Sequence, residues 1–224
     1  MVATDDLAYW ERFYARNGAT QVPSDFAVWV AGATGSLGSW NAGSALGHLF
    51  DVGCGNARDT FFFADQGFEV TGIDQCGRAI GVNRVRAGML GLDVLFLEGD
   101  LTRFGYDDLS DGPYSIYARW VLHTLDPFAE ERFFGILGKL ENLKYLFLEC
   151  RTINDSLYSM GEKVGHHAFV TDHYRRFINP VDLRTRLEAG LARHFDMLLY
   201  EESKEFDLAV EDHPTLLRVV LRVG

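Results

Sequence analysis

The sequence predicts one α/β domain with a mostly parallel sheet, and two observations predict it. Short apolar runs of the kind found in buried strands alternate with segments of helical periodicity. A glycine-rich turn, Gly53-Cys54-Gly55, directly follows one such strand and precedes a helix. With 224 residues, the chain is long enough for one compact domain with a sizeable core.

Residues 1–45 are expected to form a helical cover. Within residues 5–17, apolar side chains recur at the spacing of one helix face. A second short helix is expected over residues 26–31, with Ser24 as its N-cap. Residues 32–47 are rich in glycine and serine, which indicates a loop.

The first strand and the turn after it have the composition of a ligand-binding element. Leu49, Phe50 and Val52 are apolar, as a parallel strand requires. Gly53 and Gly55 allow the backbone to turn sharply and to approach a ligand, because no Cβ intrudes.

A helix and a second strand follow the turn. Residues 58–66 have a helical pattern that ends at Gly67, a C-cap residue. The strand at residues 68–73 then places Asp74 at its carboxyl end, where a carboxylate can accept hydrogen bonds from both hydroxyls of a ribose. The layout therefore predicts a site for a nucleoside-bearing cofactor.

Two glycine fingerprints compete for this turn. The dinucleotide pattern needs a small residue at its third position, where this chain has Arg58. The pattern acidic-x-Gly-x-Gly-x-small matches as Asp51, Gly53, Gly55 and Ala57. With this match the chain resembles class I S-adenosylmethionine-dependent methyltransferases.

The resemblance covers roughly residues 46 to 224. It implies a Rossmann-like fold: a seven-stranded, mostly parallel sheet with helices on both faces and an antiparallel last strand. The remaining strands are expected at residues 94–97, 143–150, 194–200 and 215–223, with the fourth strand and the segment after it at residues 114–125. Further helices are expected at 77–89, 127–141 and 180–190.

The resemblance also implies S-adenosylmethionine as cofactor and S-adenosylhomocysteine as product. Asp100 stands where the family holds the adenine amino group, and Asp51 or a backbone carbonyl can meet the ammonium group. Trp10 and Tyr14 could cover the methionine part, with simple amphipathic packing as the alternative. The predicted cofactor-binding residues are Trp10, Tyr14, Asp51, Gly53, Gly55, Arg58, Asp74, Gln75, Asp100, Leu101 and Arg119.

The composition and net charge of the chain disfavour some classes of binding partner. The net charge is −11, and no basic stripe is visible, which disfavours nucleic acid and anionic membranes. No apolar run approaches the roughly 20 residues of a membrane span, and the N-terminus lacks the pattern of a secretory signal. Three cysteines suggest no disulfide framework. We expect a cytoplasmic enzyme, with a homodimer possible.

Residues 151–179 are expected to form a loop insertion that selects the substrate. The stretch is too long for an ordinary connection of 2–6 residues, and loops at strand carboxyl ends carry substrate sites in such folds. Arginine forks match carboxylates and phosphates. The predicted substrate-binding residues are Arg151, His167, His173, Arg175 and Arg176. Surface salt bridges are the alternative for each arginine.

Histidines are the candidate catalytic residues. A hydroxyl acceptor would gain from a general base, with His123 as first candidate and His173 as second. A phosphate or carboxylate oxygen would need no base, and the histidines would then only orient the substrate. His166, His167, Asp172 and His173 offer ligand types, but their spacing fits no zinc pattern, so no metal is expected.

The sequence thus predicts a methyltransferase of a small anionic metabolite that carries a phosphate, phosphonate or carboxylate, possibly sugar-linked, with oxygen as the favoured acceptor atom. Two alternatives remain. One is an NAD-dependent oxidoreductase, and the other is a catalytically silent cofactor-binding subunit.

Overall fold

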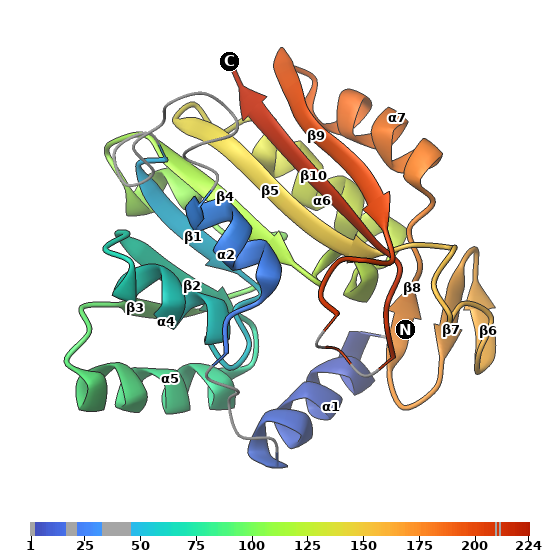
Figure 1. Ribbon diagram of the computed structural model, residues 1–224, viewed down its shortest axis with the longest axis horizontal. Helices are drawn as coiled ribbons and strands as arrows, with labels where there is room; N and C mark the ends of the chain where they lie inside the picture. The colour runs from blue at the N-terminus through green and yellow to red at the C-terminus, as the bar shows by residue number, and fades with distance from the viewer. Residues whose placement is uncertain (1–2, 17–21, 33–45, 209, 211) are drawn as a thin grey trace.

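The computed structural model describes residues 3–16, 22–32, 46–208, 210 and 212–224. Its centre is a seven-stranded sheet in the order β3-β2-β1-β4-β5-β10-β9 (Figure 1). Only β10 runs antiparallel to its neighbours β5 and β9. The predicted fold is therefore confirmed, including the antiparallel last strand. The strands are β1 (His48–Val52), β2 (Val70–Asp74), β3 (Leu95–Glu98), β4 (Tyr114–Arg119), β5 (Leu143–Arg151), β9 (Phe195–Ser203) and β10 (Leu216–Val223).

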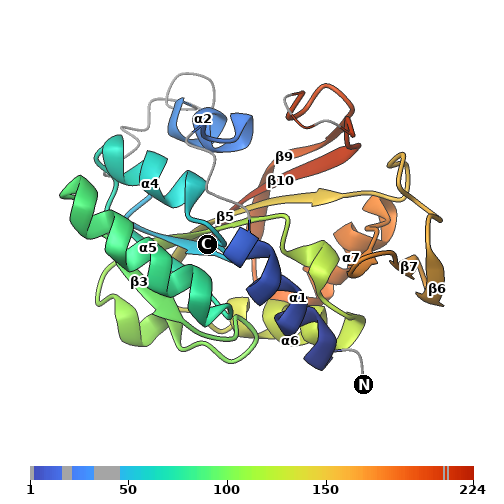
Figure 2. The same cartoon turned by 90° about the horizontal axis from the view of Figure 1, so that it is seen from below.

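Helices cover both faces of the sheet (Figure 2). One face carries α2 (Asp25–Gly32), α4 (Arg58–Asp65) and α5 (Gly77–Leu90), and the other carries α6 (Pro127–Leu137) and α7 (Pro180–Leu191). Helix α1 (Ala3–Arg16) lies across the carboxyl ends of the parallel strands (Figure 1). Short 3₁₀ helices occupy Tyr106–Leu109 and Leu122–Thr124. No described helix is long and apolar enough to cross a membrane.

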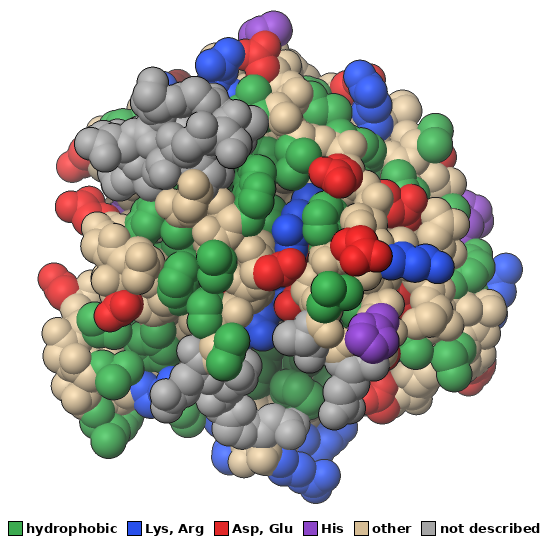
Figure 3. All heavy atoms as spheres, in the orientation of Figure 1, with side chains coloured by type: hydrophobic (Ala, Val, Ile, Leu, Met, Phe, Trp, Pro, Cys, Tyr) green, Lys and Arg blue, Asp and Glu red, His purple; other side chains and the backbone are tan. Residues whose placement is uncertain are grey.

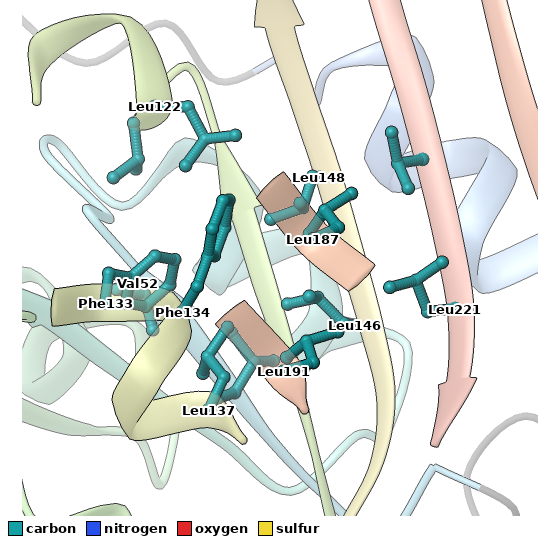
Figure 4. Packing of buried hydrophobic residues seen from close by; sticks show 14 of the residues in the cluster. Val52, Leu122, Phe133, Phe134, Leu137, Leu146, Leu148, Leu187, Leu191 and Leu221 are labelled. Carbon is teal, nitrogen blue, oxygen red and sulfur yellow. The ribbon is translucent and has the colours of Figure 1, made fainter. Parts of the chain in front are cut away.

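The main core lies under α6 and α7. Figure 4 shows side chains of both helices packed against the sheet, among them Phe133, Phe134 and Leu187. Helix α6 ends at Leu137, four residues before the predicted end. At the next residue, Gly138, a Cβ would lie 2.3 Å from the Leu191 carbonyl oxygen, so the chain passes the end of α7 here without a side chain.

The second helix has the predicted N-cap. The Ser24 hydroxyl accepts a hydrogen bond from the Ala27 N–H at 3.1 Å, and it donates to Asp59 at 2.7 Å, which ties α2 to α4. Helix α2 continues one residue beyond the predicted end, to Gly32. The loop predicted after it lies mostly in residues 33–45, outside the described residues.

The stretch 151–179, expected to be a loop, instead contains a three-stranded antiparallel sheet: β6 (Glu162–Gly165), β7 (Ala168–Val170) and β8 (Tyr174–Arg176). Its two ends meet beside the end of β5. The Ile178 N–H donates to the Arg151 carbonyl at 3.0 Å, and the Ile153 N–H donates to the Ile178 carbonyl at 3.0 Å. The stretch therefore leaves the main sheet and returns to it at one place.

Candidate active site

A cavity of about 540 Å³ opens where the parallel strands end. One wall, which we call the glycine side, is formed by the β1–α4 turn and the ends of β2 and β3, and includes Gly53, Asp74 and Asp100. The opposite wall, the histidine side, includes Trp120, His123, His173 and Arg175. Helix α1 contributes Tyr9, Trp10, Phe13 and Tyr14 to the lining.

The β1–α4 turn needs its glycines. Gly53 and Gly55 have φ of +73° and +51°, the left-handed region that favours glycine. A Cβ on Gly53 would lie 2.3 Å from Val121 Cγ2, and one on Gly55 would lie 2.2 Å from the Tyr14 hydroxyl. The backbone therefore approaches both α1 and the segment that follows β4 more closely than any side chain would allow.

Asp74 organises this turn. One carboxylate oxygen accepts the Gly55 N–H at 2.9 Å, and the other accepts the Cys76 N–H at 2.8 Å. Burial raises its pKa, while the two N–H donors favour the charged form. Each oxygen keeps a further lone pair, so the carboxylate can still accept hydrogen bonds from vicinal hydroxyls. This geometry fits the ribose of a nucleoside.

Asp100 and Asp51 fit two other parts of S-adenosylmethionine. Asp100 accepts the Thr102 N–H at 2.9 Å through one oxygen, and its side chain is partly exposed at the cavity. Asp51 is buried beneath the turn, where the Thr60 hydroxyl donates to it at 2.5 Å. Burial raises the pKa of Asp51 to about 7. A cation beside it, such as an amino-acid ammonium group, would favour the charged form.

Arg58 and Arg119, the two arginines predicted to bind the cofactor, line the cavity. Each of them already forms a salt bridge within the protein. Arg58 lies 3.3 Å from Asp59. Arg119 is paired with Glu149 at 2.8 Å and with Asp207. Arg119 therefore also holds the chain after β9 against β4.

His123 is the least satisfied polar residue on the histidine side. It is 4% exposed and has no hydrogen bond to any described residue. Burial lowers its pKa well below 6.5, and the nearby guanidinium groups of Arg151 and Arg175 lower it further. Its imidazole is therefore neutral at pH 7.

His173, in contrast, has one ring nitrogen in a hydrogen bond, and its other ring nitrogen lies beside a carboxylate without hydrogen-bond geometry. Arg175 donates to Nε2 at 3.0 Å, and Nδ1 lies 2.9 Å from Asp172. Because arginine is only a donor, Nε2 must accept and the ring proton must be on Nδ1. The Tyr9 ring stacks on the imidazole with centroids 4.5 Å apart. Burial and Arg175 lower the pKa of His173 to about 4, so it is neutral at pH 7 and it orients Arg175.

The three arginines predicted to bind the substrate, Arg151, Arg175 and Arg176, lie in different environments. Arg151 lines the cavity but forms salt bridges with Asp155 and Asp212. Arg175 also lines it, and no carboxylate of the described residues lies within 4 Å of its guanidinium. Arg175 is therefore a cation of this cavity that lacks an anionic partner in the described part of the chain.

Arg176 and His167 are not brought to the cavity. Neighbouring residues of a strand point to opposite faces, so Arg176 turns into the protein, where it pairs with Glu130 and donates to the Leu125 carbonyl at 2.8 Å. The His167 ring contacts the Tyr158 hydroxyl at 2.8 Å instead. For these two residues the substrate-binding prediction is corrected. In the described ranges, no group of three potential metal ligands converges.

The cavity lining also includes Tyr9, Trp120 and Asp172, which are not among the predicted catalytic, cofactor-binding or substrate-binding residues. Tyr9 donates to Asp172 at 2.9 Å and so links α1 to the segment before β8. Trp120 has φ of +59°, which no sequence pattern signals for a tryptophan. Asp172 could have been predicted, because it directly precedes His173, one of the predicted substrate-binding residues.

Figure 3 shows acidic and basic side chains interspersed over the face seen in Figure 1, with no continuous basic patch in its coloured part.

Comparisons with known proteins agree with this geometry. Residues 49–136 match the family model described as a methyltransferase domain. No curated protein matches the chain.

Solved structures with a similar fold include the CcbJ methyltransferase from Streptomyces caelestis, with a TM-score of 0.67, 15% identity, and coverage of 96% of this chain and 98% of that chain. An S-adenosylmethionine-dependent methyltransferase from Clostridium acetobutylicum has a TM-score of 0.66 and 10% identity, with 97% and 96% covered. The glycopeptide N-methyltransferase MtfA has a TM-score of 0.63 and 17% identity, with 91% and 97% covered. At such identities the likeness concerns the fold.

Proposed function

We propose that this chain, which is a class I S-adenosylmethionine-dependent methyltransferase, methylates an oxygen atom of a small metabolite that carries a carboxylate, phosphate or phosphonate group. The observation that carries the proposal is that no carboxylate of the described residues lies within 4 Å of the Arg175 guanidinium on the histidine side. The NAD-dependent alternative finds no support, because the matched family is that of methyltransferases.

The glycine side would hold the cofactor. Asp74 would accept hydrogen bonds from its ribose, Asp100 from its adenine amino group, and Asp51 would face its ammonium group. Bound there, the cofactor supplies a methyl group on a sulfonium, which is already a good leaving group. The protein then has to align the acceptor with that methyl group, and orientation of this kind can supply much of the rate.

The histidine side would hold the acceptor. The Arg175 guanidinium offers a planar fork that matches a carboxylate or phosphate, and His173 fixes its direction through the 3.0 Å contact. Burial is the main reason that His123 stays neutral, and the positive potential of Arg151 and Arg175 lowers its pKa further; the same potential disfavours a protonated amine at this wall. An anionic metabolite with an oxygen acceptor suits this environment better than an ammonium-bearing one.

The test is methyl transfer with isotopically labelled cofactor. S-adenosylmethionine with a ¹³C-methyl group is incubated with the protein and a panel of small hydroxy acids, carboxylates, phosphorylated alcohols, neutral alcohols and amines. The methyl chemical shift of each product shows whether oxygen or nitrogen was methylated. We expect O-methyl products from the anionic members. Methylated amines, or equally rapid methylation of uncharged alcohols, would overturn the proposal.

A further inference from the structure

The Trp120 indole is covered by two guanidinium groups. The guanidinium carbons of Arg119 and Arg151 lie over its ring, 4.3 Å and 5.0 Å from the ring centroid. All three residues line the cavity. A cation over an aromatic face is attracted to the ring, and indole is the ring that attracts it most strongly. The two arginines therefore fix where the indole stands in the cavity wall.

The backbone of Trp120 shows that this position is imposed on the residue. Its φ of +59° lies in the left-handed region, which is unfavourable for a residue with a bulky side chain. The Trp120 N–H donates to the Glu149 carbonyl at 2.7 Å, which holds this backbone against β5. Strained residues of this kind cluster at functional sites, where the surrounding structure maintains them. The outlier therefore points to a functional role for the position of the indole.

One partner of each guanidinium group is a fully buried carboxylate. Glu149, on β5, lies 2.8 Å from Arg119. Asp155, shortly after β5, lies 3.1 Å from Arg151. The Asp155 carboxylate also accepts the Leu157 N–H at 2.8 Å, so its place is fixed by the backbone. These two ion pairs belong to the interior of the fold.

The second partner of each guanidinium group comes from the connection between β9 and β10. Asp207 pairs with Arg119. Asp212 lies 2.8 Å from Arg151. Asp207 is itself held in place, because its N–H donates to the Asp25 carboxylate at 2.8 Å. One connection therefore supplies a carboxylate to each of the two arginines that cover the indole.

We propose that Asp207 and Asp212 help to select the acceptor: by fixing the two arginines, they fix the Trp120 indole as part of the wall that the acceptor touches. The inference rests on the proposed function. It adds the connection between β9 and β10 to the segment that carries Arg175 as a determinant of specificity. Trp120 is the specificity-determining residue, and the two aspartates are positioning residues, since they act through the arginines.

Asp212 offers the sharpest test, because its charge and its positioning role have opposite effects. Its carboxylate acts electrostatically on Arg175. A negative charge there opposes an anionic acceptor, so removal of the charge alone would lower the KM. Loss of the indole's position would raise the KM instead. The Asp212 side chain is partly exposed, so its substitution leaves the buried ion pairs of the interior in place.

The kinetic experiment compares Asp212→Asn with the wild type, using the acceptor that the labelled-cofactor panel identifies. We expect the KM for that acceptor to rise about two- to fivefold, with kcat and the Kd for S-adenosylmethionine unchanged. Asp212→Glu keeps the carboxylate and should restore the wild-type KM. Asp196→Asn, which breaks an exposed ion pair with Arg222 outside the cavity lining, is the matched control and should change nothing. A lower or unchanged KM in Asp212→Asn would overturn the inference.

The position of the indole can be measured without turnover. Indole N–H signals of the ¹⁵N-labelled protein are recorded with S-adenosylhomocysteine bound, and Trp120→Phe assigns the Trp120 signal. We expect Asp212→Asn to shift this signal and to leave that of Trp29, on α2, in place. Benzoate, a carboxylate with a bulky body, should shift the Trp120 signal of the wild type and bind more weakly to Asp212→Asn. If the Trp120 signal responds neither to the substitution nor to benzoate, the inference is wrong.

The inference and the proposed function fail separately. If the panel yields no O-methylated anion, the proposed function fails, whereas the indole and benzoate measurements still decide the role of Trp120. If anionic metabolites are methylated but the KM and the Trp120 signal of Asp212→Asn match the wild type, only the inference fails. Circular dichroism of each variant shows that it is folded before its constants are compared.

Discussion

The two walls of the cavity differ in how their polar groups are satisfied. On the glycine side, both oxygens of Asp74 accept backbone N–H groups, and Asp100 accepts the N–H of Thr102. On the histidine side, Trp120 Nε1 and His123 lack hydrogen-bond partners, and Arg175 lacks an anion in the described chain. The glycine side is therefore organised before any ligand binds, whereas the histidine side would be completed by its substrate.

This difference predicts which substitutions affect which ligand. Changes on the glycine side should weaken cofactor binding by removing an organised network. Substitutions on the histidine side should leave the Kd for the cofactor unchanged and raise the KM for the acceptor. The four predictions below run from the largest expected effect to the smallest.

Asp74→Ala should have the largest effect. It removes a charged acceptor from two backbone N–H groups and from the ribose, and hydrogen bonds to charged groups contribute about 1.5–3 kcal/mol each. We expect the Kd for S-adenosylmethionine, measured by calorimetry, to rise roughly 100-fold or more. Asp93→Ala, at an exposed position before β3, is the control and should leave the Kd unchanged. A rise below tenfold would show that Asp74 is not central to the site.

The adjacent arginines of β8 should separate stability from function. Arg176 is buried against Glu130, so Arg176→Met leaves that carboxylate with Arg186 alone and should lower the free energy of unfolding by about 3 kcal/mol in urea titrations. Arg175→Met should leave stability nearly unchanged and raise the KM for the acceptor by roughly tenfold or more. Equal losses of stability in both variants would contradict this assignment.

Acid should weaken the histidine side through protonation of His173. Since the pKa of His173 is lowered from 6.5 to about 4, its folded form binds fewer protons than its unfolded form between these values. Its contribution to stability is therefore present above pH 6.5 and is lost as the pH falls towards 4. Protonation of Nε2 would also break the contact from Arg175.

The pH dependence is measured by urea titrations and by the KM for the acceptor between pH 7 and pH 4.5. His173→Gln should flatten the stability profile in that window. A loss of acceptor affinity centred at pH 6.5 would instead indicate an unshifted histidine.

Tyr9→Phe should have the smallest effect. It removes the hydrogen bond to Asp172 but keeps the ring stacked on His173. Because Asp172 is exposed, we expect a two- to fivefold rise in the acceptor KM, about 0.5–1 kcal/mol, with the Kd for S-adenosylmethionine unchanged. An effect larger than that of Arg175→Met would mean that α1, rather than β8, anchors the acceptor.

The sequence predicts the glycine side better than the histidine side, for a physical reason. The glycine side is built from contiguous segments, since one strand, one turn and one helix place Asp51, Gly53 and Gly55 together. Asp74 and Asp100 follow at the ends of the next two strands, as the parallel order requires.

The histidine side depends on tertiary contacts that no local pattern encodes. Arg175 and Arg176 are equivalent in sequence, and only the register of β8 decides that one faces the cavity and the other Glu130. The left-handed backbone of Trp120 results from its packing beside Arg119 and Arg151. Neither feature could have been derived from residue types alone.

The two ends of the β6–β8 segment lie side by side, held by backbone hydrogen bonds, and this has a consequence for how such enzymes diversify. Residues 153–177 leave and re-enter the fold at the Arg151–Ile178 contact, so this segment is a cassette whose replacement would leave the order of the main sheet intact. It carries His173 and Arg175, whereas the glycine side lies elsewhere in the chain. Under the proposed function, exchange of this cassette between relatives would be a route to new acceptors that leaves the methyl donor unchanged.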